Sequence, residues 1–202
     1  MKFKEIKITD VVSFYITNLP TINNFELIKD LKFNMKVNKK TSVESVKEPG
    51  IQSYIILKTK AIKNLNTKIY KKIFKFLNYN TSDINLYFST EWIYVSNKNN
   101  NWSRFHTHTF SDTLKTDIDW SFVYYAQMPN NLNEQEGKIL FRTNEGIEVS
   151  YLPQVGDLIL FPANLLHKPE LNRSSDIERI VYAGGFTILD YTKEYGSKKN
   201  IY

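Results

Sequence analysis

The spacing of apolar residues divides the chain into two parts with different periods. In the first part, apolar residues recur at helical intervals over 23–31 and 62–77, and the second of these stretches has the pattern of an amphipathic helix. Short strands are predicted at 11–16 and 51–57, and the polar, Lys-rich stretch 35–50 is predicted to form a surface loop. We expect the apolar stripe of the second helix to pack on a sheet, with its lysines in solvent.

From about residue 84 the apolar period changes to two, which is typical of strands. The predicted strands are 84–95, 105–109, 120–127, 138–142, 147–151, 157–161 and 178–189. Many short strands with few helices between them favour an antiparallel sandwich or barrel over β-α-β units. We therefore predict one domain of the mainly β (α+β) class, with residues 1–83 as helical and strand support, 84–190 as the β core and 191–202 as a tail.

Composition limits the classes of protein that this chain can belong to. It has 202 residues, of which 42% are hydrophobic, so it can bury a substantial core without disulfide bonds or a structural metal. The absence of cysteine excludes a disulfide scaffold, thiolate zinc sites and a Cys nucleophile, and it fits a reducing compartment. No apolar run approaches the roughly 20 residues of a membrane span, and the first residues lack the apolar region of a signal peptide. We expect a cytoplasmic protein that does not enter a membrane.

The net charge of +6 is unevenly distributed along the chain. Residues 1–80 contain 16 Lys and 6 acidic residues, a balance of +10, whereas residues 81–202 have a balance of −4. A basic first part favours an anionic partner such as nucleic acid. However, these lysines are scattered, no arginine accompanies them, and a composition rich in Lys, Asn and Ile also follows from nucleotide bias in a genome. Charge alone therefore gives weak support to nucleic-acid binding.

The three histidines of the chain fall in only two places, at His106 and His108 and then at His167. Positions i and i+2 of an extended strand point to the same face, so His106 and His108 are expected to present their imidazoles side by side. A third imidazole from the loop after a distant apolar strand could complete one face of a metal ion and leave the other face open to substrate and O2. The alternative is three unrelated histidines. Their joint spacing favours a metal site.

A buried arginine is predicted at the start of the last strand. Arg179 shares its strand face with two apolar residues, and an arginine that points into an apolar interior needs an anionic partner, for which its planar fork suits a carboxylate. The alternative is a surface salt bridge to Glu178 or Asp176. Tyr125, on a neighbouring strand, either offers a phenol to the same place or simply packs in the core.

Together these residues resemble the Fe(II)/2-oxoglutarate dioxygenases, and within them the small prolyl-4-hydroxylase-like oxygenases of phages and bacteria. The resemblance covers about residues 84–189. It is carried by H-x-H at 106–108, V-Y-Y at 123–125, G-D-L-x-L-F-P at 156–162 with the following His167, and then Arg179. It implies a double-stranded β-helix, the jelly-roll or cupin-like fold, with the N-terminal helices packed on the outside.

The resemblance also implies roles for individual residues. His106 and His167 would ligate Fe(II), and Arg179 would bind the distal carboxylate of 2-oxoglutarate, with Tyr125 donating a hydrogen bond and Tyr94 lining the pocket. The implied activity is a hydroxylase that couples oxidative decarboxylation of 2-oxoglutarate by O2 to oxidation of a C–H bond. The sequence does not identify the substrate, which could be a protein side chain, a nucleic acid or a small metabolite.

One position departs from the pattern of the superfamily, in which the first motif is usually H-x-D. His108 occupies the position of that aspartate, so a three-His triad is predicted. Alternatively, Asp112 could supply the third ligand, or Asp112 or Asp117 could orient one of the histidines. Two other functions stay open: a three-His cupin-type metalloenzyme that does not use 2-oxoglutarate, and a non-catalytic β-sandwich that binds a partner or has a structural role.

Overall fold

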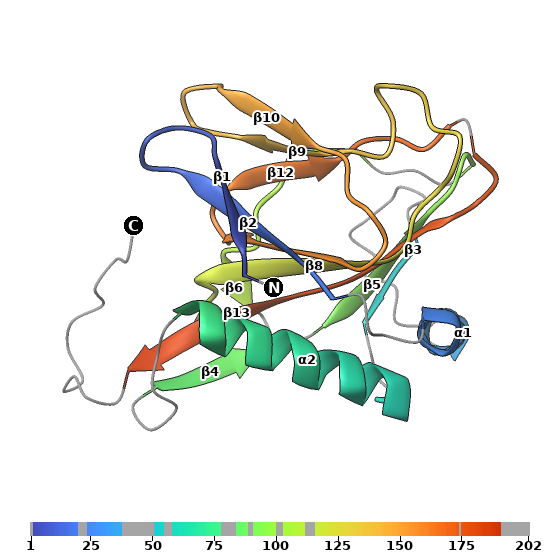
Figure 1. Cartoon of the computed structure of the whole chain (residues 1–202), viewed down its shortest axis with the longest axis horizontal. Helices are drawn as coiled ribbons and strands as arrows, with labels where there is room; N and C mark the ends of the chain where they lie inside the picture. The colour runs from blue at the N-terminus through green and yellow to red at the C-terminus, as the bar shows by residue number, and fades with distance from the viewer. Residues whose placement is uncertain are drawn as a thin grey trace.

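A computed structural model describes residues 2–19, 24–37, 51–54, 58–77, 84–88, 91–99, 103–111, 116–173 and 175–190. Within these residues, eight strands form one antiparallel main sheet (Figure 1). Seven of them follow the order β1 (Lys4–Lys7), β2 (Ser13–Asn18), β11 (Asp157–Pro162), β8 (Trp120–Gln127), β13 (Arg179–Asp190), β5 (Trp92–Ser96) and β3 (Ile51–Tyr54), and β4 (Ile84–Phe88) also pairs with β13. The mainly β class predicted from the sequence is confirmed.

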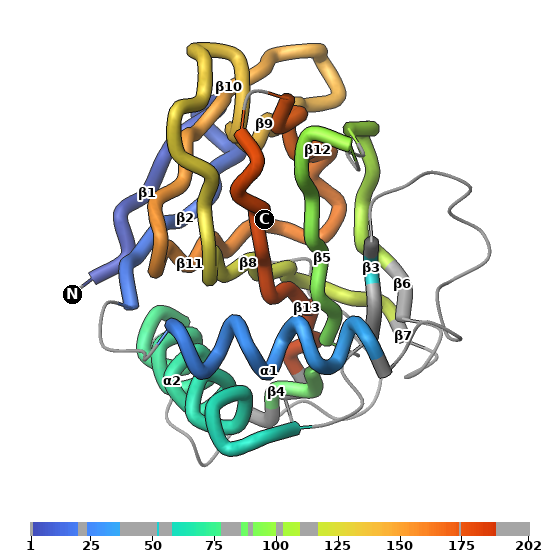
Figure 2. Tube along the Cα trace, turned by 90° about the vertical axis from the view of Figure 1, so that its right-hand side faces the viewer, coloured from blue at the N-terminus to red at the C-terminus, as the bar shows by residue number. Residues whose placement is uncertain are grey.

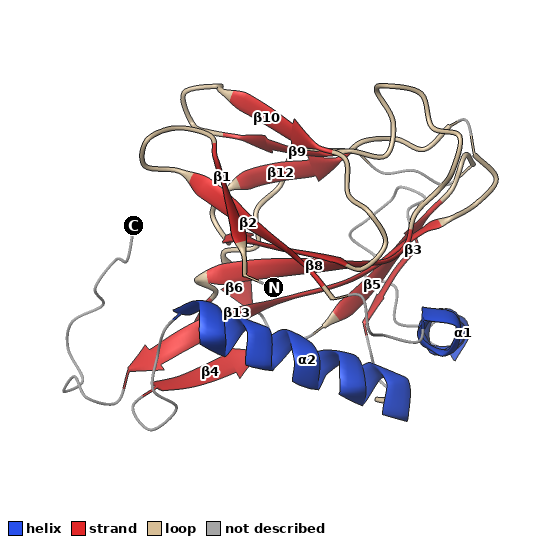
Figure 3. Cartoon of the chain, viewed as in Figure 1, coloured by secondary structure: helices blue, strands red, loops and turns tan. Residues whose placement is uncertain are grey.

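A smaller sheet faces the main one. It has the order β10 (Glu148–Tyr151), β9 (Ile139–Arg142) and β12 (Leu166–Pro169), and it lies above β8 and β13 in the view of Figure 3. Between the two sheets lies an apolar core to which Phe14, Phe141 and Phe161 contribute. We call the side of the main sheet that faces this core the interior face. A short hairpin of β6 (Phe110–Ser111) and β7 (Thr116–Asp117) stands apart from both sheets.

The two helices, α1 (Asn24–Val37) and α2 (Lys60–Leu77), cover the opposite face of the main sheet, which we call the helical face (Figure 2). Most of the apolar stripe of α2 packs there as its spacing predicted: Ile62, Leu65, Ile69 and Ile73 are fully buried. Phe74 and Leu77, which also belong to the predicted stripe, are only half-buried. Burial of a side chain of this size stabilises the fold by roughly 1.5–3 kcal/mol. No helix in the described part of the chain is long and apolar enough to span a membrane.

Strand β8 shows how one sheet serves two cores. Its alternate residues Phe122 and Tyr124 pack among the helices, whereas Val123 and Tyr125 point to the interior face. Both sets are buried, so the strand reads as a continuous apolar run rather than as an alternating pattern. The functional candidates lie on the interior face of this sheet and of its neighbours.

A buried carboxylate joins α2 to the main sheet. Glu91, directly before β5, is only 4% exposed. It accepts hydrogen bonds from Lys58 Nζ at 3.0 Å, Asn66 Nδ2 at 3.0 Å and the Tyr70 hydroxyl at 2.8 Å, and the Tyr182 hydroxyl donates in turn to Asn66. Because each polar group in this network has a partner, the network can be buried on the helical face without orphaned donors.

Several predicted boundaries are wrong. The predicted strand 84–95 is two strands, β4 and β5, which pair with different stretches of β13. The predicted strand 105–109 forms only a single bridge to β12. The first helix continues to Val37, into the predicted loop, of which 38–50 lie outside the described residues.

Candidate metal centre

The segment that carries His106 and His108 runs antiparallel beside β12. The amide of His106 donates to the carbonyl of His167 at 3.0 Å, and the amide of His167 donates back to the carbonyl of His106 at 3.1 Å. The amide of His108 donates to the Ala163 carbonyl at 2.9 Å. His167 therefore lies on a strand, not in the loop that the sequence predicted, and this backbone pairing brings residues far apart in the chain together.

The three imidazoles converge on one point. Their ring centroids are 4.8 Å apart for His106 and His108, 4.3 Å for His106 and His167, and 4.7 Å for His108 and His167. One ring nitrogen of each lies within 4.8 Å of the others. Metal–nitrogen bonds of roughly 2.0–2.1 Å set cis nitrogens about 3 Å apart, so small ring rotations would bring all three to a single ion. Within the described residues no carboxylate joins this cluster.

Hydrogen bonds fix which ring nitrogens face the cluster. Nδ1 of His106 lies 3.0 Å from the Arg104 carbonyl, and Nδ1 of His167 lies 2.9 Å from the Leu165 carbonyl. A carbonyl only accepts, so both Nδ1 atoms carry the proton and both Nε2 atoms keep a free lone pair. Nδ1 of His108 is 3.3 Å from the Ser121 hydroxyl, which can hold its ring in the same way. Contacts of this kind orient the histidine ligands of metal sites.

All three imidazoles are held in the neutral form. Burial lowers the pKa of His106, and it lowers the pKa of His108 further, with repulsion from His167 and His106 adding to the effect. Burial and the neighbouring His106 lower the pKa of His167 to about 3. Neutral imidazole is the form that binds a metal ion, so the cluster is ready to bind one at pH 7 without losing protons.

Aromatic rings enclose the cluster on its apolar sides. The His167 ring packs edge-on against Phe161 with centroids 4.6 Å apart, and Trp92 packs edge-on against His108 at 4.9 Å. Phe161 belongs to the predicted G-D-L-x-L-F-P stretch and Trp92 to β5. These contacts limit the movement of two of the three rings and exclude water from their apolar faces.

Arg179 is the first residue of β13, and its side chain is 1% exposed. Its Nε and Nη2 atoms are buried, and neither has a hydrogen-bond partner in the part of the chain that the structure describes. The alternative of a surface salt bridge is wrong: Glu178 pairs with Lys32 at 2.6 Å, and Asp176 pairs with Lys98 at 2.5 Å. A buried guanidinium with two such donors has the chemistry to bind an anion.

The two predicted tyrosines lie on the same interior face as Arg179. The guanidinium carbon of Arg179 is 5.7 Å from the Tyr94 ring centroid. Tyr125 pairs in register with Val181 beside a bulge in the β8–β13 ladder. Burial raises the pKa of the Tyr125 hydroxyl, while the nearby Arg179 charge acts to lower it, so this phenol stays protonated and can donate a hydrogen bond at neutral pH.

The sequence did not indicate two serines of this site. Ser96 is paired directly across from Arg179, is fully buried, and its hydroxyl has no hydrogen bond within the described residues. Ser121 contacts His108 from β8. The period-two pattern places Ser96 on one face with Tyr94, so it would have pointed to Ser96 if the boundary of β5 had been known.

The G-D pair of the sequence pattern has a structural role. Gly156 has φ of +90°, a conformation that favours glycine, and the Asn18 side chain would lie 3.2 Å from an added Cβ. The Asp157 carboxylate accepts hydrogen bonds from Asn18 Nδ2 at 3.0 Å, the Tyr151 hydroxyl at 2.8 Å and the Gln154 amide at 2.8 Å. These bonds fix the turn that leads into β11.

Of the two carboxylates considered as alternatives, the structure describes only Asp117. Asp112, the alternative third ligand, lies outside the described residues. Asp117 lies on β7, where its side chain is exposed. Among the described residues, His108 is the candidate for the third ligand, because its ring lies beside both other imidazoles.

No protein-family model and no curated protein sequence matches the chain. Solved structures do match its fold. A Pseudomonas putida prolyl-4-hydroxylase is 13% identical, with a TM-score of 0.59 over 87% of this chain and 92% of that one. A Trichoplax adhaerens prolyl hydroxylase, solved with a hypoxia inducible factor peptide, is 15% identical, with a TM-score of 0.62 over 86% and 82%.

A third structure, a Burkholderia pseudomallei oxidoreductase of the 2OG-Fe(II) oxygenase family, is 13% identical, with a TM-score of 0.57 over 85% of this chain and 84% of that one. At identities this low, the structural matches establish a shared architecture and nothing more. The two facing sheets and the helices outside the main sheet are thus the jelly-roll, double-stranded β-helix fold of these oxygenases, and the predicted fold is confirmed.

Proposed function

We propose that this protein is a non-haem Fe(II)- and 2-oxoglutarate-dependent dioxygenase, with O2 and an organic substrate as its reactants. One observation carries the proposal: three neutral imidazoles converge on the interior face of the same barrel that buries Arg179 with two unused donors. A metal cluster alone would suit many functions. The Arg179 guanidinium, with two buried donors that no described residue accepts, indicates in addition that the ligand carries a carboxylate as well as a metal-chelating group.

His106, His108 and His167 would hold the ion through Nε2, because two of their Nδ1 atoms donate to backbone carbonyls and the third lies beside Ser121. Arg179 would bind the distal carboxylate of 2-oxoglutarate. When bound, Fe(II) and 2-oxoglutarate supply the O2 chemistry that oxidises a C–H bond of the substrate, coupled to decarboxylation of the cosubstrate. The chain orients these groups and keeps water from them.

The charge of the site suits a dianionic cosubstrate. The three imidazoles are neutral, and no carboxylate joins them in the described structure, so the ion would not be compensated by its protein ligands. Arg179 adds a further positive charge in a buried place. A dianion that spans the ion and the guanidinium compensates both, and the attraction is stronger in a buried site than in water.

Two buried hydroxyls can complete the carboxylate site. The Tyr125 hydroxyl is a protonated donor near Arg179, and the Ser96 hydroxyl has no hydrogen bond within the described residues. The burial of Arg179 also favours this function over a cupin-type metalloenzyme without 2-oxoglutarate, because a buried guanidinium with donors that no described residue accepts needs an anion, and 2-oxoglutarate supplies one.

Anaerobic titration with Fe(II), followed by titration with 2-oxoglutarate, tests the proposal. We expect one Fe(II) per chain, a second binding event for 2-oxoglutarate only after metal, and succinate formation once O2 is admitted. His106→Ala and His167→Ala should each lose the metal event. Tyr124→Phe, on the helical face of the same sheet, is the matched control and should keep both events.

Each other outcome assigns a different function. If the wild-type protein binds no metal stoichiometrically, the oxygenase proposal is wrong and a non-catalytic β-sandwich remains. If it binds metal but 2-oxoglutarate neither binds nor is consumed, the three-His cupin-type function remains.

A further inference from the structure

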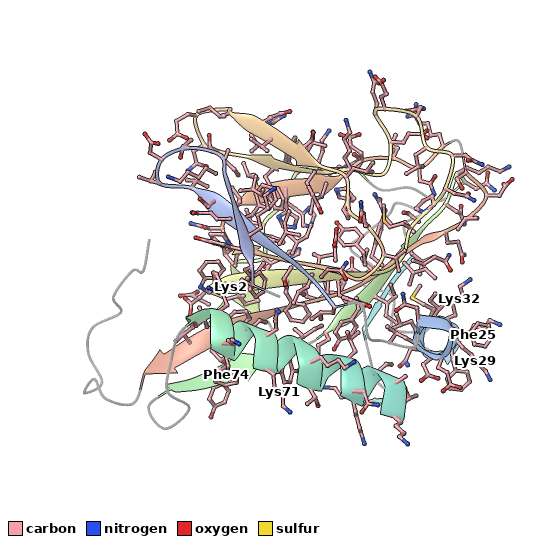
Figure 4. The ribbon with its side chains drawn as sticks, in the orientation of Figure 1. Lys2, Phe25, Lys29, Lys32, Lys71 and Phe74 are labelled. Atoms are coloured by element: carbon pink, nitrogen blue, oxygen red, sulfur yellow. The ribbon has the colours of Figure 1, made fainter. Side chains whose placement is uncertain are left out.

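The outer side of α2 is uniformly basic. The helix contains no acidic residue, and its lysines are Lys60, Lys63, Lys68, Lys71, Lys72 and Lys75. Lys60, Lys63, Lys71 and Lys75 are exposed along the side opposite the buried apolar stripe. Figure 4 shows Lys71 and Phe74 pointing away from the sheet. At 1.5 Å per residue, the row from Lys60 to Lys75 is about 22 Å long.

None of these four lysines is neutralised by a described carboxylate. Some cations elsewhere in the described structure do pair with carboxylates, as in Lys58 with Glu91, Lys98 with Asp176 and Lys168 with Glu170. The four exposed lysines of α2 form no ion pair with any described residue. Like charges one helical turn apart repel each other, and an anionic partner would remove that repulsion.

Helix α1 adds exposed aromatic rings to the same layer. Phe25 is 79% exposed and Phe33 is 51% exposed. Lys29 and Lys36 lie on the same side of the helix, since residues four, eight and eleven positions after Phe25 share one stripe. Figure 4 shows Phe25 and Lys29 pointing away from the rest of the protein. One exposed acidic residue, Glu26, lies on α1 beside them.

Exposed phenyl rings among unpaired lysines are the combination that binds single-stranded nucleic acid, because lysines contact phosphates and rings stack on unpaired bases. A membrane surface fits less well. An interfacial helix inserts a continuous apolar face, and in both helices that face is already buried in the core, through Leu27 and Leu31 in α1 and Ile62 and Ile69 in α2.

We propose that α1 and α2 form a binding surface for single-stranded nucleic acid, with the lysines on the phosphates and Phe25 and Phe33 on the bases. The surface lies on the helical face of the main sheet, whereas the three histidines lie on the interior side. It is therefore separate from the metal centre, and it would attach the protein to nucleic acid independently of the chemistry at that centre.

Fluorescence anisotropy with labelled oligothymidylate of about 20 nucleotides tests the proposal, with no metal added. Six phosphate contacts predict a slope of about −4 in log K against log[salt], since each contact contributes about −0.7 for single strands. Lys63→Gln/Lys71→Gln/Lys75→Gln should reduce this slope to about −2 and weaken binding about 100-fold at 0.1 M salt. The charge-matched control Lys98→Gln/Lys138→Gln/Arg173→Gln should bind like the wild type.

The aromatic part of the proposal has its own readout. Phe25→Ala/Phe33→Ala should weaken binding of the single strand by about 5-fold or more per ring, with an unchanged salt slope. The same variant should bind duplex DNA like the wild type, because paired bases offer no free face to the rings.

Three results would overturn the proposal. The first is equal loss of affinity in the control and in the α2 variant, which would reduce the effect to net charge. The second is no binding of the single strand by the wild type at 0.1 M salt, where the lysines should add strongly to affinity. The third is competition by anionic phosphatidylserine vesicles through Phe25 and Phe33, which would assign the surface to a membrane.

Discussion

Replacement of Arg179 by methionine should change stability and ligand binding in opposite directions. In the ligand-free protein the guanidinium is 1% exposed, and two of its nitrogens have no hydrogen bond within the described residues. A buried donor without a partner costs about 1–3 kcal/mol, so these two donors together destabilise the protein by roughly 2–6 kcal/mol. The Tyr94 ring, 5.7 Å away, offsets about 0.5–2 kcal/mol of this cost.

Methionine fills a similar volume without polar atoms. Exchange of a buried charge for a well-packed apolar side chain stabilises proteins by about 1–4 kcal/mol, so Arg179→Met should raise the free energy of unfolding by an amount in that range. For a chain of this length, each kcal/mol corresponds to a rise of about 2–4 °C in Tm. Cosubstrate binding should be lost, because a carboxylate buried without its partner costs 2–5 kcal/mol, or roughly 30-fold or more in affinity.

Thermal unfolding with Mn(II) in place of Fe(II), with and without 2-oxoglutarate, measures both effects in one experiment. Without 2-oxoglutarate, the wild type should have a lower Tm than Arg179→Met. With 2-oxoglutarate at 100 times its Kd, the free energy of unfolding of the wild type should rise by about 2.7 kcal/mol. Arg179→Met should start from a higher Tm and show no rise. Arg173→Met, at an exposed arginine, is the control and should behave like the wild type. If Arg179→Met is less stable than the wild type and keeps the full ligand response, the assignment of Arg179 to the cosubstrate is refuted.

Two further predictions concern protonation and the helical face. The metal-free protein should lose stability as pH falls below 6.5, because the unfolded chain protonates His167 near its ordinary pKa whereas the folded chain holds that pKa near 3. The free energy of unfolding should fall by about 1.4 kcal/mol per pH unit. In a pH series of urea unfolding, the dependence of this free energy on pH should be weaker for His167→Gln than for the wild type. Glu91→Ala should lower the free energy of unfolding in urea by about 3–5 kcal/mol, because it leaves Lys58, Asn66 and Tyr70 without their shared acceptor. The control Glu26→Ala should change this free energy little. A near-zero effect of Glu91→Ala would contradict this account of the network.

The spacing of apolar residues predicted correctly those helices and strands that bury apolar side chains along their whole length. The predicted strand 120–127 coincides with β8, and the apolar stripe of α2 packs where its spacing placed it. Strand β12 has no such pattern: its sequence is Leu-His-Lys-Pro, and it is a strand because it pairs with β9. Pairing with a distant segment leaves no periodic signal in a stretch of four residues.

The same distinction applies to the candidate site. Two histidines at i and i+2 and an arginine among apolar neighbours could be recognised because each signal is local. The roles of Arg104 and Leu165 could not, since they contribute only backbone carbonyls, and any residue type at those positions offers one. Ser96 was missed because the predicted strand ended at residue 95, one residue before the end of β5.

Three irregular features of the described structure belong to its interior face, which is an argument for function that does not depend on similarity to other structures. Arg179 has buried donors that no described residue accepts, and the imidazoles are kept neutral at a cost in stability below pH 6.5. The β8–β13 ladder has a bulge between Ile180 and Val181, next to Arg179 and Tyr125. A bulge near a site re-aims side chains. By contrast, the polar network around Glu91 on the helical face is well satisfied. Substitutions that remove each of these three features would be accessible if stability alone had shaped the chain. Their persistence on the interior face is therefore what a face used for binding and chemistry predicts.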